Sequence, residues 1–230
     1  MKIMANDREK EAAARASLQY VKDGQVVGLG TGSTAAYFIK LLGEKVQKGL
    51  RIRGIPTSDR SRELALSLGI PVITLDDCQE IDVTVDGADE VDPQLRLIKG
   101  GGGALLREKI VASVTKQMVV VADASKQVER LGKFPLPVEV IRFAQAVIAK
   151  RIGTLGAEVK LRMTAEGTPF VTDENNHILD CWFGEIRDAD ALARTLSDMP
   201  GIVEHGLFIG MASVVLFARG NEIVELKRRG

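Results

Sequence analysis

Cysteine and histidine are scarce in this 230-residue chain, which has two of each. Cys78 and Cys181 lie far apart, with no CxxC spacing and no histidine beside either, so neither a zinc site nor a disulfide framework is indicated. We expect two buried thiols in a reducing compartment. His177 and His205 fall in the second half of the chain, away from the acidic motif described below, so a Ser-His-Asp triad is not available.

The chain also lacks a net charge and long apolar runs. Its 31 lysines and arginines balance 31 aspartates and glutamates, so no overall field attracts nucleic acid or an anionic membrane. The most apolar runs, Met118–Ala122 and Ala212–Ala218, are far shorter than the roughly 20 residues of a membrane-spanning helix. Residues 1–21 mix acids and bases without the apolar stretch of a signal peptide. We expect an amphipathic N-terminal helix and a cytoplasmic protein.

The first part of the chain alternates short β-branched runs with stretches of helical periodicity. The expected strands are Gln25–Leu29, Arg51–Ile55, Val72–Leu75, Ile81–Val85 and Met118–Ala122. The expected helices are Ser33–Lys48, Ser58–Leu68 and Ala104–Thr115. This alternation is typical of right-handed crossovers and a parallel sheet, and nearly continuous apolar strands are typical of a sheet covered on both faces. The sequence therefore predicts a doubly wound, mostly parallel α/β domain.

Two prolines within Leu131–Ile141 interrupt this pattern and suggest a domain boundary. The elements expected after it are a helix Arg142–Ile152, a strand Glu158–Met163, a hairpin through residues 173–177, a strand Ile178–Trp182, a helix Ala189–Ser197 and a strand Gly201–Glu204. That order predicts a small α+β domain of the ferredoxin-like kind. The last expected strands, Leu207–Ile209, Ser213–Ala218 and Glu222–Lys227, could return to the first sheet. We expect domains of residues 1–130 plus 206–230 and of residues 131–205.

A first glycine-rich motif, GLGTGST, spans Gly28–Thr34 between an expected strand and an expected helix. Unpaired N–H groups and the positive end of a helix dipole suit a phosphate at such a place. No GK[ST] follows as in a P-loop, and the alternating glycines do not form GxGxxG. The hydroxyls of Thr31, Ser33 and Thr34 favour a sugar phosphate over a dinucleotide. A tight turn with Ser33 or Thr34 as the helix cap would also account for the motif.

A second motif, DGADEVDPQLRLIKGGGGALLREK, runs from Asp86 to Lys109 and is unlike a core segment. Asp86 ends an expected strand, at the edge where ligands bind in open α/β sheets, and Asp89 follows after a Gly-Ala turn. Two neighbouring carboxylates repel, so we expect at least one of them to keep its proton near neutral pH or to pair with a cation, for which Lys99 is the candidate. Four consecutive glycines then leave the backbone bare for a ligand, and Glu108 follows on a helix. The motif indicates proton chemistry beside a bound ligand.

Two alternatives remain open for this second motif. The acids could be solvated residues of a turn and Lys99 an ordinary surface lysine. Asp86, Asp89 and Glu108 could instead bind a divalent metal, although Lys99 would compete with a cation there.

With these motifs, the chain resembles the type A ribose-5-phosphate isomerases. The likeness runs in order through GLGTGST, IPTSDRS, VDGADEVD, LIKGGGGALLREKIVA, VVVADASKQVERLGKFPLPVEV and PGIVEHGLF, and covers nearly the whole chain. The resemblance implies a Rossmann-like domain with a smaller α+β domain, and a homodimer or homotetramer without cofactor or metal. It implies interconversion of D-ribose 5-phosphate and D-ribulose 5-phosphate in the non-oxidative pentose phosphate pathway. Residues 158–178 look less typical of the family but carry none of this chemistry.

The resemblance also implies roles for individual residues. Glu108 would be the base that moves a proton between C2 and C1 through an enediolate, a step of general-base catalysis. Asp86 and Asp89 would contact the sugar hydroxyls, with Asp86 helping ring opening, and Lys99 would stabilise the enediolate oxygen. The further residues implied to bind substrate are Thr31, Gly32, Ser33, Thr34, Gly87, Ala88, Gly100, Gly101, Gly102 and Lys126.

Two competing functions have weaker support from the sequence. A sugar-phosphate sensor that regulates transcription would need a DNA-binding element, and only about one helix precedes the first expected strand. Such a sensor would also have no use for a positioned base such as Glu108. A nicotinamide-dependent oxidoreductase would need the GxGxxG fingerprint, which is missing.

Overall fold

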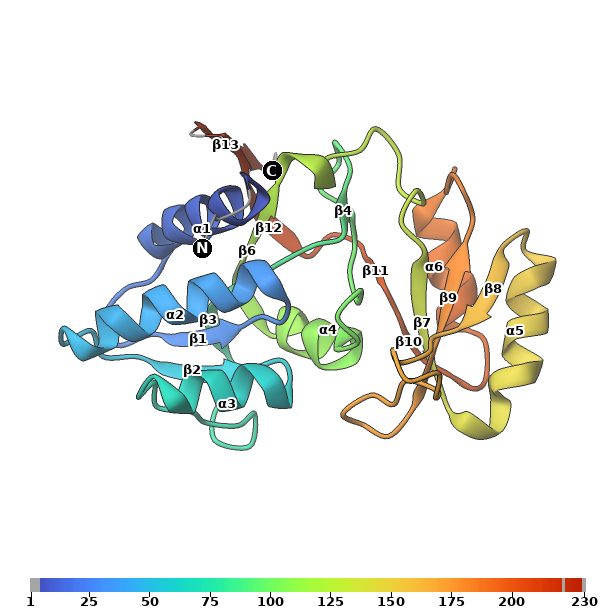
Figure 1. Cartoon of the computed structure of the whole chain (residues 1–230), viewed down its shortest axis with the longest axis horizontal. Coiled ribbons are helices and arrows are strands. Elements are labelled where there is room, and N and C mark those ends of the chain that lie inside the picture. The colour runs from blue at the N-terminus through green and yellow to red at the C-terminus, as the bar shows by residue number, and fades with distance from the viewer. Residues whose placement is uncertain (1–4, 221, 229–230) are drawn as a thin grey trace. The chain divides into compact units, whose positions relative to one another are not determined.

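The computed structural model describes residues 5–220 and 222–228, which fold as two compact units (Figure 1). The first unit comprises the described residues of Met1–Ala88, Arg107–Gln127 and Met211–Gly230. The second comprises Asp89–Leu106 and Val128–Gly210.

The first unit is built on a six-stranded sheet. Its strands, in spatial order, are β13 (Glu222–Lys227), β12 (Ala212–Arg219), β6 (Thr115–Asp123), β3 (Ile81–Asp86), β1 (Val26–Leu29) and β2 (Arg53–Pro56). All neighbours are parallel except β12 and β13, which pair antiparallel at one edge. The expected doubly wound, mostly parallel sheet is confirmed.

Helices cover both faces of this sheet. They are α1 (Ala5–Ser17), α2 (Ser33–Gln47), α3 (Asp59–Ser67) and α4 (Leu105–Ser113). Side chains alternate between the two faces of a strand. Val27 of β1 accordingly packs in a core with Phe38 and Leu42 of α2, whereas its neighbour Val26 packs with Val111 of α4 on the other face.

The second unit contains a four-stranded antiparallel sheet and a small three-stranded one. The chain order of the larger part is β7 (Leu136–Val140), α5 (Gln145–Thr154), β8 (Glu158–Leu161), β9 (His177–Trp182), α6 (Ala189–Ser197) and β10 (Ile202–His205). Its spatial order is β10-β7-β9-β8. A β-α-β-β-α-β chain with this strand order has the expected ferredoxin-like topology. The three-stranded sheet has the order β11 (Leu207–Phe208), β5 (Leu97–Ile98), β4 (Glu90–Val91).

Two expectations about strands were wrong. The predicted strand Val72–Leu75 is reduced to a single bridge between Val72 and Gly54, because Asp77 turns the chain away by accepting hydrogen bonds from the backbone N and hydroxyl of Thr74, each at 2.9 Å. The strand predicted at Leu207–Ile209 does not return to the first sheet. It becomes β11, whose partner is β5.

The compact units therefore differ in their limits from the domains expected from the sequence. The segment Asp89–Leu106 groups with the second unit, because β4 pairs with β5 and β5 in turn pairs with β11. The junctions between the units fall inside the acidic and glycine-rich motif, after Ala88 and after Leu106. The domain limits themselves remain a prediction.

Candidate active site

The first unit has a switch point between β1 and β3. These two strands are parallel neighbours, yet β1 leads through α2 to β2 on one side, while β3 precedes β6 on the other. Ligands of open α/β sheets bind at the carboxyl ends of the strands at such a point, where the connections diverge. The segment after β1 is residues 30–34, and the last residue of β3 is Asp86.

The carboxylate of Asp86 is buried and held by backbone amides at this switch point. Its Oδ1 accepts hydrogen bonds from the backbone N–H of Thr31 at 3.0 Å and of Gly87 at 2.7 Å. A Cβ added to Gly30 would lie 2.2 Å from the same oxygen, so only glycine allows the loop to approach so closely. Three residues predicted for the site, Thr31, Asp86 and Gly87, are thus brought together.

A cluster of hydroxyl groups supports the loop after β1. Thr31 Oγ1 lies 2.7 Å from Thr57 Oγ1, 2.8 Å from Ser58 Oγ and 3.2 Å from Ser61 Oγ. Ser61 Oγ in turn donates to the carbonyl of Gly30 at 2.7 Å. Sequence reasoning did not assign Thr57, Ser58 or Ser61 to the site. The run TSDRS directly after β2, with Ser58 as the N-cap of α3, is the signal that could have indicated them.

The helix α2 begins with backbone groups directed at the same edge of the sheet. Its N-cap is Gly32, with φ of 105° and no side-chain cap, so neither Ser33 nor Thr34 is the cap. Ser33 is exposed and Thr34 half-buried. The N–H groups of a first helical turn lack partners within the helix and suit an anion, so this place is chemically fitted to a phosphate.

Glu108 lies in the first turn of α4 and is 3% exposed. Further along α4, Val111 packs with Val26 and Ile81, the first residues of β1 and β3. The later part of α4 thus covers the amino ends of the strands. Its first turn, which carries Glu108, therefore lies toward their carboxyl ends, where Asp86 also lies. The adjacent Arg107 pairs with Asp59 of α3 at 2.8 Å.

Lys126 follows the carboxyl end of β6, the neighbour of β3. It is half-buried and belongs to a 3-10 turn, Ala124–Lys126, whose cap is Asp123, an acceptor from Ser125 N at 3.0 Å. Because β6 and β3 are parallel, Lys126 comes from the same edge of the sheet as Asp86.

Of the remaining predicted residues, Ala88 is half-buried and belongs to the first unit, whereas Asp89, Lys99 and residues 100–102 belong to the second. Asp89 Oδ2 accepts from the backbone N–H of Gly101 at 2.7 Å. Lys99 is 2% exposed, and its Nζ lies 5.4 Å from the ring centre of Phe208, within range of a cation–π contact. Gly101 and Gly102 are exposed, whereas Gly100 is buried.

The glycine run is shaped by its own backbone and by one arginine. Gly100 and Gly103 have φ of 100° and 86°, values that favour glycine, and a Cβ on Gly103 would lie 2.4 Å from the Phe170 ring. Arg162 Nη1 donates to the carbonyls of Gly100 at 2.8 Å and Gly101 at 3.2 Å, and the same side chain pairs with Asp180. Sequence reasoning missed Arg162, and the pairing of β8 with β9 that places Asp180 near it is not visible locally.

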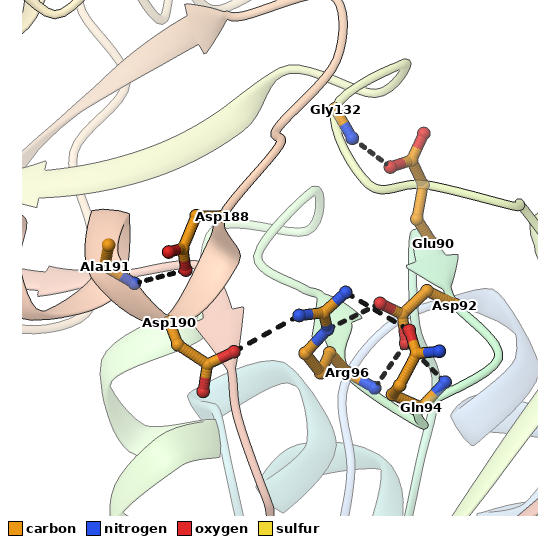
Figure 2. A network of polar contacts seen from close by, with 8 residues as sticks. All are labelled: Glu90, Asp92, Gln94, Arg96, Gly132, Asp188, Asp190 and Ala191. Carbon is orange, nitrogen blue, oxygen red and sulfur yellow. Dashed lines mark hydrogen bonds and ion pairs between the residues drawn. The ribbon is translucent and has the colours of Figure 1, made fainter.

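Two further acids of the DGADEVD motif have structural roles within the second unit (Figure 2). Glu90 accepts from the backbone N–H of Gly132 at 2.7 Å. Asp92 is buried and pairs with Arg96 Nε at 2.6 Å, and Arg96 also reaches Asp190 of α6 at 3.2 Å. The motif therefore combines structural acids with the candidate site acids, a division that its composition does not show.

Metal-ligand clusters and membrane spans are absent from the described residues. No group of three or more histidine, cysteine, aspartate or glutamate residues there could hold a metal ion. No described helix is both long enough and apolar enough to cross a membrane.

Comparison with known proteins places the chain in a family. The sequence profile of a family described as ribose 5-phosphate isomerase A (phosphoriboisomerase A) matches residues 53–222. The ribose-5-phosphate isomerase A of Parvibaculum lavamentivorans is 54% identical over 229 residues, which cover 96% of this chain and 99% of the relative. That of Sinorhizobium fredii is 53% identical over 91% of this chain and 93% of the relative.

The chain belongs to the ribose 5-phosphate isomerase A family. Solved structures of ribose 5-phosphate isomerases agree with this assignment. The Methanocaldococcus jannaschii protein superposes with a TM-score of 0.92 at 41% identity, covering 96% of this chain and 99% of its own. A D-ribose-5-phosphate isomerase in complex with phospho-erythronic acid gives 0.94 at 41% identity, covering 97% of this chain and 99% of its own. The family fold, with its Rossmann-like sheet, is therefore the fold of this chain.

Proposed function

We propose that this chain interconverts D-ribose 5-phosphate and D-ribulose 5-phosphate in the cytoplasm. The observation that carries the proposal is the buried carboxylate of Glu108, which lies in the first turn of α4, toward the sheet edge that also bears Asp86 and the Thr31 loop. A buried carboxylate among fixed polar groups is suited to proton transfer next to a carbonyl. Family membership supplies the substrate.

The phosphate of the substrate is assigned to the start of α2. The backbone N–H groups after Gly32 and the hydroxyls of Ser33 and Thr34 offer donors to its oxygens. Lys126, which follows β6 at the same sheet edge, supplies a positive charge. The Thr31 hydroxyl is already committed to the hydroxyl cluster, so its proposed part is to hold the loop in shape.

The isomerisation is assigned to Glu108 as the single base. In the open-chain aldose, Glu108 takes the proton from C2, and the electron pair forms the C1–C2 double bond while O1 becomes the oxyanion. O1 then receives a proton, O2 loses one, and the resulting enediolate collapses to a carbonyl at C2. Glu108 returns its proton to C1, which gives the ketose and restores the base.

The remaining roles follow the sequence motif. Asp86, held by two backbone amides, is assigned to the sugar hydroxyls and to ring opening. Lys99 is assigned to the enediolate oxygen, where a positive charge stabilises the intermediate without a metal ion. Substrate contacts are also assigned to Gly87, Ala88, Asp89 and residues 100–102. We further propose a homodimer or homotetramer, for which light scattering of the purified chain is the direct test.

A coupled assay tests this function. Ribose 5-phosphate is supplied in the presence of a chelator, and the appearance of the ketose is followed for the wild type, for Glu108→Gln and for Glu63→Gln. Glu63 is an exposed acid of α3 and serves as the matched control. We expect ketose formation by the wild type and the control. A chain that binds ribose 5-phosphate without turning it over would be a sensor, and the proposal would be wrong.

A further inference from the structure

The first unit contains a pocket of about 480 Å³ on the side of the sheet covered by α4. Its walls come from the end of β2, from α3, from residues 72–75 and from the part of α4 between Arg107 and Val111. The apolar residues that matter most here are Ile55, Val72, Leu75 and Ile110. The side chain of Ile110 is 42% exposed. The volume falls within the range of about 300–1,000 Å³ that is typical of small-molecule sites.

The pocket combines this apolar lining with positive charge. Arg62 of α3 and Arg107 of α4 both line it, and none of its described lining residues is acidic. The Arg62 side chain forms no ion pair with any residue in the described part of the chain. Arg107 is partly neutralised by Asp59. One uncompensated guanidinium thus borders an apolar cavity and offers two parallel donors to an anion.

The pocket faces a different side of α4 from the candidate base. The α4 residues that line the pocket, Arg107, Ile110 and Val111, share one face of the helix. Because successive residues of a helix are about 100° apart around its axis, the centre of this face lies about 100° from Glu108. None of the residues assigned to the substrate above lines this pocket. A ligand bound here would therefore not occupy the place of the sugar phosphate.

We propose that this pocket binds a small molecule with an apolar ring body and a single anionic group. The ring body lies against Ile55, Val72 and Ile110, and the anionic group meets Arg62. This binding is a separate property of the chain and does not rest on the proposed isomerisation.

The test uses a fluorescent probe of this chemistry with its uncharged counterpart. Anilinonaphthalene sulfonate, an apolar anion, and phenylnaphthylamine, the same ring system without the sulfonate, are titrated into the full-length wild type. Arg62→Gln removes the proposed contact. Arg60→Gln is the matched control, because Arg60 is also an exposed arginine of α3 but does not line the pocket.

We expect one sulfonate probe per chain, with a dissociation constant raised about tenfold in Arg62→Gln and unchanged in Arg60→Gln, the size of effect of one charged hydrogen bond. The uncharged probe should bind about tenfold more weakly than the anion. Equal binding of both probes, or equal binding by both variants, would overturn the proposal. The proposal would also be overturned if a second copy of the chain covered the pocket. In that case the wild type would not bind the probe, and the variant Ile110→Glu would have half the molar mass of the wild type.

Discussion

The backbone N–H of Thr31 donates a hydrogen bond of 3.0 Å to Oδ1 of Asp86 and so joins the loop after β1 to the end of β3. These residues are 55 positions apart in the sequence, and the parallel pairing of β1 with β3 brings them together. The bond couples the proposed phosphate-binding loop to the proposed sugar-binding carboxylate. A change that displaces either partner should therefore affect both parts of the site.

Replacing Gly30 by alanine should damage the site through this bond. The new Cβ would lie 2.2 Å from Asp86 Oδ1 and 2.6 Å from its Cα, so the backbone must shift. We expect a loss of about 1–3 kcal/mol in the free energy of unfolding, typical of overpacking, and a raised KM for ribose 5-phosphate. Urea denaturation and steady-state kinetics measure both.

Gly153→Ala is the control for that substitution. Gly153 lies in α5, and a Cβ there would meet nothing within 4 Å. Because alanine suits a helix better than glycine, this variant should gain about 0.5–1 kcal/mol of stability and keep its activity. If Gly30→Ala behaved like Gly153→Ala, the close packing of the loop on Asp86 would be refuted.

The hydroxyl cluster around Thr31 predicts a difference between two conservative variants. Thr31→Val leaves the hydroxyls of Thr57 and Ser58 without their shared partner, and we expect a loss of about 1–3 kcal/mol of stability. Thr31→Ser keeps the hydroxyl and should lose less. Thermal unfolding of the two variants compares them directly. Equal stability would mean that the cluster does not support the loop.

Glu139 predicts a dependence of stability on pH. Burial raises the pKa of this carboxyl above its ordinary value of 4.5, and the charges of Glu174 and Asp173 act in the same direction, against hydrogen bonds from Asn176 and Thr172. The folded chain thus holds this proton to a higher pH than the unfolded chain. The contribution of Glu139 to stability is therefore largest at low pH and falls as the pH rises from about 4.5 through the folded pKa.

The variant Glu139→Gln isolates this contribution, because glutamine does not titrate. Urea denaturation of wild type and variant should be compared between about pH 4 and pH 8, on either side of the ordinary value for glutamate. We expect the fall in stability over the lower part of this range to be smaller in the variant. Parallel curves for the two proteins would contradict the assignment.

The two cysteines should differ in reactivity. Cys181 is fully buried in β9, and burial raises the pKa of its thiol to about 12, so little thiolate forms at neutral pH. Cys78 is half-buried. A thiol-reactive reagent should therefore label Cys78 in the folded chain and label both residues in urea. Rapid labelling of Cys181 under native conditions would show that the second unit opens far more readily than its packing indicates.

Much of the first sheet could be predicted because its strands are short, nearly continuous apolar runs that can be recognised locally. Such runs became β1, β3 and β6, and Asp86 was correctly placed at the end of β3. The prediction of a strand at Val72–Leu75 was wrong because Asp77, which lies outside the apolar run, turns the chain. A short apolar run does not reveal such a contact.

The supporting residues of the candidate site were harder to predict. The hydroxyl partners of Thr31 follow the end of β2 in the sequence. Arg162 donates a hydrogen bond to the carbonyl of Gly100, which is 62 positions away. Such contacts are fixed by strand pairing and sheet order, which a single sequence does not display. The motif residues were proposed for the site because a dense run of glycines and acids is unlike a core segment, and their part in the site stays a prediction.

Glu108 is proposed to move a proton between C2 and C1 of the substrate. The most direct measurement is incubation of ribose 5-phosphate in deuterium oxide, with solvent deuterium at C1 of the ketose followed by NMR for wild type and Glu108→Gln. We predict deuterium at C1 with the wild type. With Glu108→Gln we predict a fall in both isomerisation and exchange of at least about 10²-fold, with the circular dichroism spectrum unchanged. Near-normal exchange by a folded Glu108→Gln variant would show that Glu108 is not the base.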